Sequence, residues 1–152
     1  MPQYWLFKTE PDEYSIDDLA REGECLWEGI RNYQARNRLR DEVKVGDLVF
    51  IYHSSCAVPA VVGLAEVVVT GCVDDAQFNA RSPYHDSKST REAPRWVTVR
   101  VRYREHLPNE ITLKDIKSQK SFANMELVTR ARLSIQHVSQ KDAERLLKQG
   151  RQ

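Results

Sequence analysis

The sequence lacks the features of membrane-spanning, secreted and disulfide-rich proteins. No apolar run approaches the roughly 18 residues that cross a bilayer, so we expect no membrane-spanning helix and no membrane partner. Residues 1–4 carry neither the basic segment nor the apolar stretch of a signal peptide, which favours a cytoplasmic protein. The cysteines are only three, Cys25, Cys56 and Cys72, and they form no C-x-x-C pair. This odd count predicts reduced thiols and argues against a disulfide scaffold or a zinc ribbon.

Signatures of the common catalytic loops are also missing. The sequence contains no G-x-x-x-x-G-K-[ST], no G-x-G-x-x-G, no H-E-x-x-H and no G-x-S-x-G. The clusters of metal-ligand types are His53-x-x-Cys56 and His85-Asp86, and neither has a second pair at a matching spacing. We therefore expect no metal and no cofactor. His53 could activate Ser54 or Cys56, but neighbouring side chains of a strand point to opposite faces, which disfavours His53 acting on Ser54.

Charge of either sign is not in excess. The chain has 23 Lys and Arg against 22 Asp and Glu, a formal net charge of +1, which excludes a histone-like polycation and an acidic tail protein. The two signs are nevertheless segregated. Residues 10–28 hold eight acids and one base, residues 31–40 hold four arginines and no acid, and residues 88–104 hold six bases and one acid. Such segregation can create a local positive field, unless the basic and acidic faces pair with each other.

Aromatic residues accompany both basic stretches. Trp27 and Tyr33 stand beside the first, and Tyr84, Trp96 and Tyr103 beside the second. Arginine next to aromatic rings is typical of a nucleic-acid surface, although a core wall rimmed by arginines has the same composition. The segment 27–37 combines a tryptophan, a tyrosine, a glycine, two arginines, two asparagines and a glutamine. These groups suit a site for a planar heterocycle, and the alternative is a capped surface helix.

The hydrophobic pattern predicts strands with short helices between them. With 152 residues, 41% of them hydrophobic, we expect one domain over residues 1–152. The clearest alternation, at 96–104, puts Val97, Val99 and Val101 on one face and arginines on the other. An irregular polar stretch at 74–94 is long enough to be functional. The predicted strands are 4–9, 48–52, 59–69, 96–104 and 133–138, and the predicted helices are 15–23, 32–40, 112–117 and 139–150. They imply an α+β domain on a curved, largely antiparallel sheet or small barrel.

Motifs distributed along nearly the whole chain resemble the EVE domain, the family of the thymocyte nuclear proteins. They are YWLFKTEP at 4–11, YS at 14–15, WEGIRNYQARN at 27–37, GD at 46–47, YHS at 52–54, VGLAEV at 62–67, Trp96 and RLSIQ at 132–136. The resemblance implies a PUA-like fold, a bent antiparallel β pseudo-barrel with short flanking helices. It also implies a relationship to the YTH and SRA readers of modified bases and to ASCH domains. EVE relatives are thought to bind modified bases in DNA or RNA, with no agreed enzymatic activity.

The similarity to YTH domains implies where the base would bind. There, a lysine-led turn after the first strand meets an aromatic cage, and the corresponding positions here are Lys8-Thr9-Glu10, Trp27 and Tyr84. Tyr84 replaces the tryptophan of the YTH pattern. We therefore predict a base-binding set of Lys8, Thr9, Glu10, Trp27, Asn32, Tyr33, His53, Ser54 and Tyr84. We predict a phosphate-binding set of Arg31, Arg36 and Arg38.

The predicted activity is recognition of a modified base in nucleic acid without turnover, by a monomer or weak homodimer. The base would stack between Trp27 and Tyr84, while Glu10, Thr9 and Asn32 read its polar edge. One alternative is an ASCH-like ribonuclease or a nucleoside or nucleotide hydrolase that uses Lys8, Glu10 and Tyr33. Another is a small-ligand or protein-interaction module that uses the same cleft.

Overall fold

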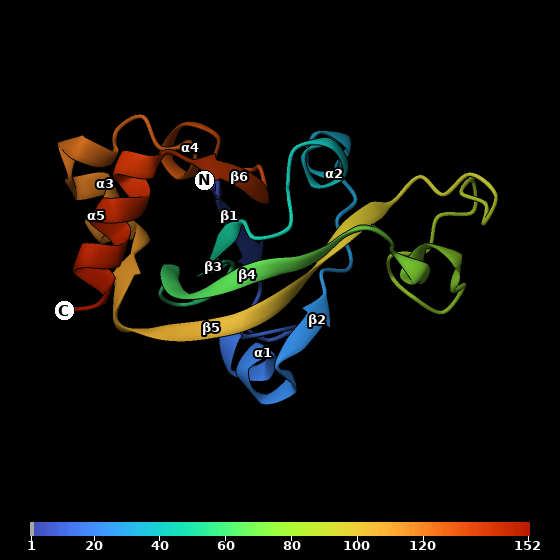
Figure 1. Cartoon of the computed structure of the whole chain (residues 1–152), viewed down its shortest axis with the longest axis horizontal. Coiled ribbons are helices and arrows are strands. Elements are labelled where there is room, and N and C mark those ends of the chain that lie inside the picture. Colours follow the sequence, from blue (N-terminus) through green and yellow to red (C-terminus); the bar gives the residue numbers. More distant parts are fainter. Residues whose placement is uncertain (1) are drawn as a thin grey trace.

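A strongly bent sheet of six strands forms the centre of the structure (Figure 1). The structure is a computed structural model that describes residues 2–152, so Met1, part of the domain predicted over 1–152, lies outside the described residues. The strands follow the order β2-β5-β4-β3-β1-β6 across the sheet. Their bounds are β1 (Tyr4–Thr9), β2 (Glu24–Leu26), β3 (Leu48–His53), β4 (Ala60–Val73), β5 (Val97–Thr112) and β6 (Ile135–Val138).

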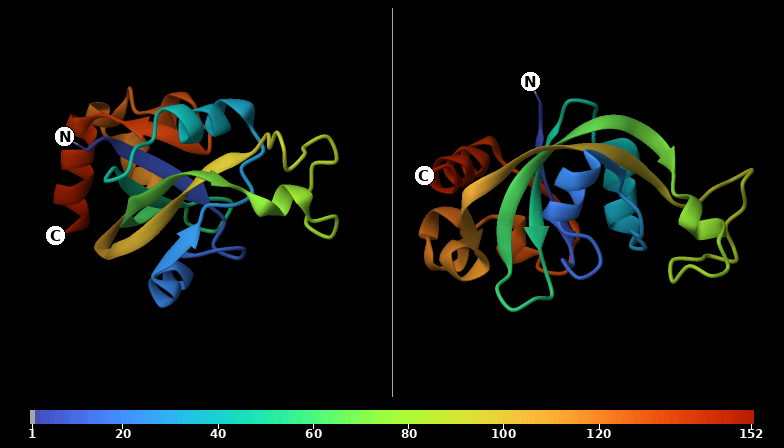
Figure 2. Two further views of the ribbon diagram at one scale, coloured as in Figure 1. Left: turned by 45° about the vertical axis from the view of Figure 1, so that its right-hand side comes forward. Right: turned by 90° about the horizontal axis from the view of Figure 1, so that it is seen from below.

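The sheet is antiparallel except for one pair, β1 and β3, which run parallel with Tyr4 opposite Leu48. The long β4–β5 pair contains four shifts of register, and such irregularities increase local twist and bend a sheet. The curvature is plain in Figure 2, where β4 and β5 arch over the rest. The edge strands β2 and β6 do not pair with each other within residues 2–152. The predicted pseudo-barrel is therefore a bent but open sheet.

Short helices begin at capping residues that the sequence makes visible. Ser15 and Asp18 form a capping box at the start of α1 (Ile16–Glu22), and Gly23 ends this helix with φ +84°. Asn32 caps α2 (Tyr33–Asp41), and Ser139 caps α5 (Gln140–Gly150). The remaining helices are α3 (Leu113–Ser118), α4 (Glu126–Thr129) and the 3₁₀ turns η1 (Asp75–Phe78) and η2 (Lys120–Phe122). None of the helices in residues 2–152 is long and apolar enough to span a bilayer.

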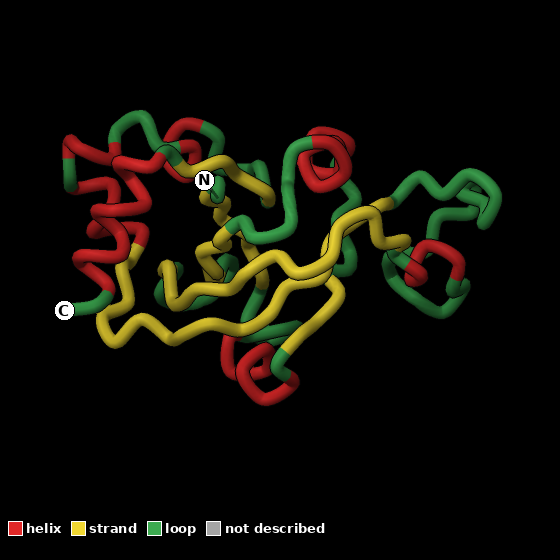
Figure 3. The backbone as a smooth tube through the Cα atoms, in the orientation of Figure 1, coloured by secondary structure: helices red, strands yellow, loops and turns green. Residues whose placement is uncertain are grey.

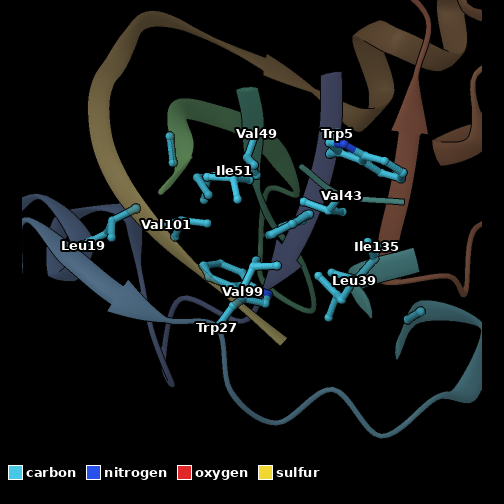
Figure 4. Close-up of a cluster of buried hydrophobic side chains, with 14 of the residues drawn as sticks. Trp5, Leu19, Trp27, Leu39, Val43, Val49, Ile51, Val99, Val101 and Ile135 are labelled. Atoms are coloured by element: carbon cyan, nitrogen blue, oxygen red, sulfur yellow. The ribbon is translucent and has the colours of Figure 1, made fainter. Parts of the chain in front are cut away.

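Alternate residues of β1 face two separate hydrophobic cores, because β1 lies inside the sheet between β3 and β6. Trp5 and Phe7 belong to the first core, which also contains Trp27 (Figure 4). Leu6 belongs to the second, which packs against α3, α4 and α5 at one end of the molecule. The indole N–H of Trp5 donates to Asp47 Oδ2 over 2.9 Å. Because Trp27 belongs to the first core, this core anchors the segment 27–31, which lines the candidate site.

The polar stretch between β4 and β5 projects from the sheet as an arm, residues 74–96, most of it loop (Figure 3). Two buried polar side chains organise it. The amide nitrogen of Gln77 donates to the carbonyls of Asp74 and Trp96, and its Oε1 accepts from Ser89 Oγ and Trp96 N–H. The side chain of Asp74 accepts from the N–H groups of Ala76 and Gly29. The arm therefore has a defined conformation despite its lack of regular structure.

The strands β4 and β5 extend beyond their predicted ends, to Val73 and Thr112, and β2, α4 and both 3₁₀ turns were not predicted. Strand β2 has three residues and depends on pairing with β5, between Glu24 and Arg102 for example. A pairing partner so distant in sequence leaves no local pattern. The mixed α+β class and the predicted capped helices are confirmed.

Candidate nucleic-acid interface

A cavity of about 550 Å³ opens where the end of β1, the segment 27–31 and the loop before β6 meet. This volume lies in the usual range for a site that binds a small organic molecule. Its wall includes six of the nine residues predicted to bind a base, together with Arg31. The full lining is Lys8, Thr9, Glu10, Glu13, Trp27, Glu28, Gly29, Ile30, Arg31, Tyr52, Ser54, Ser55, Pro59, Tyr84, Leu113, Lys117, Leu127, Ala131, Arg132 and Ser134.

Trp27 lines this cavity and is only 5% exposed. Its ring centroid lies 5.4 Å from that of Phe7 and 6.5 Å from that of Tyr14, at interplanar angles of 51° and 89°. Its backbone is fixed to β5, since Trp27 N–H donates to Val99 O and Thr98 Oγ1 donates to Trp27 O. The indole therefore belongs to the first core (Figure 4), although Trp27 also lines the cavity. A ring so deeply buried offers little open face to the base that the sequence predicts to stack between Trp27 and Tyr84.

Tyr84 reaches the cavity from the arm and packs against Gly29. A Cβ atom at Gly29 would lie 2.7 Å from Tyr84 Cζ, and Gly29 has φ +85°, so both contact and conformation require glycine. The Tyr84 hydroxyl donates to Glu13 Oε2 over 3.1 Å. Burial and this hydrogen bond raise the pKa of Tyr84, which keeps the phenol neutral. Tyr84 and Trp27 line the same cavity, as predicted, although each ring packs on other neighbours.

Arg31 lines the cavity, and its guanidinium binds residues of the arm. Its Nη1 donates to Asp74 Oδ2 over 3.0 Å and its Nε to Tyr84 O over 2.9 Å. Its Cζ lies 5.6 Å from the ring centroid of Tyr84 and 5.0 Å from that of Trp96. The Asp74 side chain is 2% exposed and compensates the charge of Arg31. Arg31 therefore positions Tyr84 and carries little free charge toward solvent.

Carboxylates and cations occupy different parts of the wall. Glu10, Glu13 and Glu28 face the cavity near Trp27 and Tyr84. Burial, with repulsion from Asp74 and Asp75, raises the pKa of Glu28. A second hollow of about 740 Å³ adjoins this side, shares Thr9, Glu13, Trp27, Glu28 and Tyr84 with the first, and is also acidic. The acidic side is therefore able to accept hydrogen bonds but repels phosphate.

The cations Lys8, Lys117 and Arg132 line the first hollow but not the acidic second one. Lys8 Nζ donates to Ala131 O, and burial lowers the pKa of Lys8. Lys117 and Arg132 are exposed and have no ion pair within the described part of the chain. Sequence reasoning missed both. Nothing distinguishes Lys117 from other surface lysines, whereas Arg132 begins the family motif at 132–136, which was the available signal.

Three predicted base-binding residues lie outside the cavity wall. Asn32 caps α2 by accepting the N–H of Ala35 over 3.0 Å. The Nε2 of His53 accepts the N–H of Ile16 over 3.1 Å, and burial lowers the pKa of this imidazole, so it is a neutral acceptor at the start of α1. Tyr33 is 50% exposed and stacks on Trp96 elsewhere on the surface. The trio Lys8, Glu10 and Tyr33 of the enzymatic alternative is therefore not assembled.

Two predicted phosphate ligands also lie away from the cavity. Arg38 makes a bidentate ion pair with Glu126, at 2.6 and 2.9 Å, and its side chain is 13% exposed. This pair connects α2 to α4, so its role here is structural. Arg36 lies next to Tyr33, and its Nη1 donates to Arg95 O over 2.7 Å. No group of three or more His, Cys, Asp or Glu in residues 2–152 has the geometry of a metal site.

Comparison with known proteins places this arrangement in a family. The EVE domain model matches residues 3–149. An uncharacterized protein from Schizosaccharomyces pombe is 36% identical over 151 residues, covering 90% of this chain and 63% of its own length. Thymocyte nuclear protein 1 from Gallus gallus is 37% identical over 158 residues, covering 91% and 65%. The chain thus spans slightly less than two thirds of the length of these two relatives.

Solved structures share the whole fold. A hypothetical protein from Leishmania major superposes with a TM-score of 0.94 at 40% identity, covering 97% of this chain and 94% of its own. Human THYN1 protein, in complex with DNA containing 5-methylcytosine, gives a TM-score of 0.93 at 34% identity, covering 99% and 98%. An ASCH protein from Zymomonas mobilis gives 0.54 at 16% identity, covering 96% and 94%, which is a likeness of fold alone.

Proposed function

The chain belongs to the EVE domain family, and from that premise we propose that it binds nucleic acid and holds a modified base in the cavity beside Trp27. The observation that carries the proposal is the convergence of residues from five parts of the sequence on this one cavity. A planar face, hydrogen-bond acceptors and free cations meet there: Tyr84, Glu10, Glu13, Glu28, Lys117 and Arg132. The complex of human THYN1 protein with DNA containing 5-methylcytosine supports the same class of ligand.

A cytosine with a substituent at C5 fits the chemistry of the wall best. Its exocyclic amine is a hydrogen-bond donor, and a glutamate is the side chain that accepts from this amine. Glu28 and Glu13 stand on the side of the cavity next to Tyr84. The carbonyl O2 of the base needs a donor, and Lys8 has donors beyond the one it gives to Ala131. Thymine has the same methyl group but presents a carbonyl to the carboxylates, and is expected to bind more weakly.

In this arrangement Tyr84 supplies the stacking face and Trp27 a buried part of the cavity wall. Stacking on an aromatic side chain contributes about 1–3 kcal/mol per base when measured by truncation. The base would enter displaced from its strand or flipped from a duplex, because the cavity lies within the protein wall and not along a flat surface. The phosphates would lie toward Lys117 and Arg132, away from the acidic hollow. This is binding without turnover, on a bent sheet of the PUA-like type.

The decisive experiment is fluorescence anisotropy with end-labelled oligonucleotides, single-stranded and duplex, that differ at one central base. The three bases are 5-methylcytosine, cytosine and thymine, so that the methyl group and the amine are varied separately. We expect the tightest binding for 5-methylcytosine and the weakest for thymine, and Tyr84→Ala should lower the affinity for all three. Equal affinities for the three bases, or an unchanged affinity in Tyr84→Ala, would overturn the proposal.

A further inference from the structure

We propose that Tyr33, Arg36 and Arg95 form a second subsite, outside the cavity, which binds the nucleotide next to the one whose base enters the cavity. This inference rests on the proposed function and extends it from one base to a strand. All three residues, Tyr33, Arg36 and Arg95, lie outside the cavity wall. Tyr33 and Arg36 belong to the segment 27–37, whose planar groups suggested a nucleotide site.

Tyr33 presents an open aromatic face to solvent. Its ring stacks on Trp96, with centroids 4.9 Å apart and an interplanar angle of 23°. Trp96 is 5% exposed, whereas Tyr33 is 50% exposed, so the stack has a buried inner ring and an exposed outer ring. The indole N–H of Trp96 donates to Asp86 Oδ2 over 2.9 Å, which fixes the inner ring. A half-exposed tyrosine held flat in this way is a ready platform for a base.

Two arginines flank the platform without covering it. Arg36 Cζ lies 4.8 Å from the Tyr33 centroid and 5.8 Å from that of Trp96. A guanidinium on the outer face of Tyr33 would be much farther from Trp96, so Arg36 lies at the side of the stack. Arg95 Nη1 donates a hydrogen bond to the Tyr33 hydroxyl over 3.5 Å. Arg36 has no ion pair among residues 2–152; it gives three N–H groups to Asn37 Oδ1 and Arg95 O, which leaves two of its five N–H groups free. The pair of Arg95 with Asp86 is long, at 3.9 Å. Both can therefore contact a phosphate.

A chain of cation–π and aromatic contacts connects this platform to the cavity. Arg31 lies between Tyr84, which lines the cavity, and Trp96, at 5.6 and 5.0 Å from their ring centroids. The Trp96 ring in turn stacks on the ring of Tyr33. The two outer members, Tyr84 and Tyr33, are thus held at a fixed separation by two buried or half-buried planar groups. A strand whose modified base enters beside Tyr84 would place a neighbouring nucleotide over Tyr33, with its phosphate between Arg36 and Arg95.

The test compares ligands of different length. Affinities would be measured by calorimetry for 5-methyl-2′-deoxycytidine, for a trinucleotide with 5-methylcytosine at its centre, and for the trinucleotide with plain cytosine. The variants are Tyr33→Ala, Tyr33→Phe and Arg36→Gln, with Arg21→Gln on α1 as the matched control for a lost arginine. Tyr33→Phe keeps the ring and removes only the hydroxyl that Arg95 contacts.

We expect the wild-type protein to bind the trinucleotide about tenfold or more tightly than the nucleoside, and Tyr33→Ala to lose this gain while its nucleoside affinity is unchanged. Tyr33→Phe should keep most of the gain, Arg36→Gln should lose part of it, and Arg21→Gln should lose none. Equal weakening of nucleoside and trinucleotide by Tyr33→Ala, or no weakening of either, would overturn the second subsite. Failure of the proposed base recognition has a different signature, which is equal wild-type affinity for the methylated and plain trinucleotides.

Discussion

Gly29 and Tyr84 are in direct contact across the cavity wall, with the tyrosine ring occupying the space where any other residue at position 29 would place its Cβ. The two residues are 55 positions apart, and one belongs to the segment before α2 and the other to the arm. Their contact therefore fixes where the arm sits relative to the cavity.

Gly29→Ala should destabilise the protein and weaken nucleic-acid binding. The substitution meets two penalties, a left-handed backbone that costs about 1–2 kcal/mol and a clash with the Tyr84 ring. Gly71→Ala is the matched control, because Gly71 has φ +70° but no atom within 4 Å of the added Cβ. Urea unfolding should show a larger loss for Gly29→Ala, and anisotropy should show a loss of affinity in this variant alone. Equal behaviour of the two variants would mean that the Tyr84 contact is unimportant.

Asp74→Asn should loosen the arm. The carboxylate accepts from Gly29, Ala76 and Arg31, and removing its charge leaves the guanidinium of Arg31 without compensation. We expect a loss of about 2–3 kcal/mol in the free energy of unfolding, less than for a fully buried pair because the Arg31 side chain is 20% exposed. The neighbouring exposed residue Asp75 provides the control, and Asp75→Asn should change little. Comparable midpoints for both variants in urea would contradict this role.

Binding of a cytosine should weaken at low pH because of Glu28. Its pKa is raised by burial, so as pH falls it becomes protonated before an ordinary glutamate does and can no longer act as a charged acceptor for the amine of the base. The affinity should therefore start to fall above the usual glutamate range. Glu28→Gln should weaken binding at neutral pH and remove this part of the pH dependence, whereas Glu144→Gln on α5 should leave the profile unchanged. A wild-type profile that Glu28→Gln leaves intact would assign the effect to another group.

The salt dependence of binding should identify the cations that contact phosphate. Lys117→Ala and Arg132→Ala should each lower the affinity for modified and plain DNA alike, and each should reduce the slope of log K against log salt by up to about 1. Lys148→Ala, on α5, should leave the slope unchanged. Anisotropy titrations between low and moderate salt measure this directly. A slope that is unaffected by both cavity variants would show that the strand follows another path.

Arg38→Gln should destabilise the fold without changing the salt slope. Burial opposes ionisation of Glu126, but hydrogen bonds from Arg38 and from His137 N–H outweigh it and hold the pKa of Glu126 below its usual value. The stability from this depressed pKa is present above the pKa of glutamate in the unfolded chain, and is lost as pH falls through the folded value. Arg38→Gln should therefore lower stability at neutral pH, by about 2 kcal/mol, and have less effect in acid. A reduced salt slope in Arg38→Gln would instead support the phosphate-binding role predicted from the sequence.

The sequence predicts features that depend on neighbouring residues and misses those that depend on distant ones. The cap residues Ser15 and Ser139 act on backbone groups three positions away, so their helices could be predicted. The ion pair of Arg38 joins residues 88 positions apart, and that of Arg31 joins residues 43 positions apart. A run of arginines shows the charge but not the carboxylate that neutralises it. For this reason two of the predicted phosphate ligands, Arg31 and Arg38, are paired with carboxylates, and Lys117 and Arg132 carry the free charge at the cavity.

The candidate site was predicted best where family motifs and strand ends coincide. Lys8, Thr9 and Glu10 close β1 and turn toward the cavity, because a strand that ends at a proline must leave the sheet there. Asn32 and His53 could not be separated from true ligands by sequence, since an amide that caps a helix and an amide that reads a base have the same chemistry. Only their backbone partners, Ala35 and Ile16, distinguish the two roles.

The wall of the cavity is assembled from the first strand, the middle of the chain and the segment just before β6, so no short stretch contains enough of it to act alone. Occupancy by a ligand and the folding equilibrium are consequently linked: whatever binds there must raise the melting temperature of the entire chain. A thermal-shift screen of free nucleosides can therefore rank ligands without labels. By the same linkage, a substitution that merely destabilises a remote core will lower apparent affinity once a sizeable fraction of the molecules is unfolded.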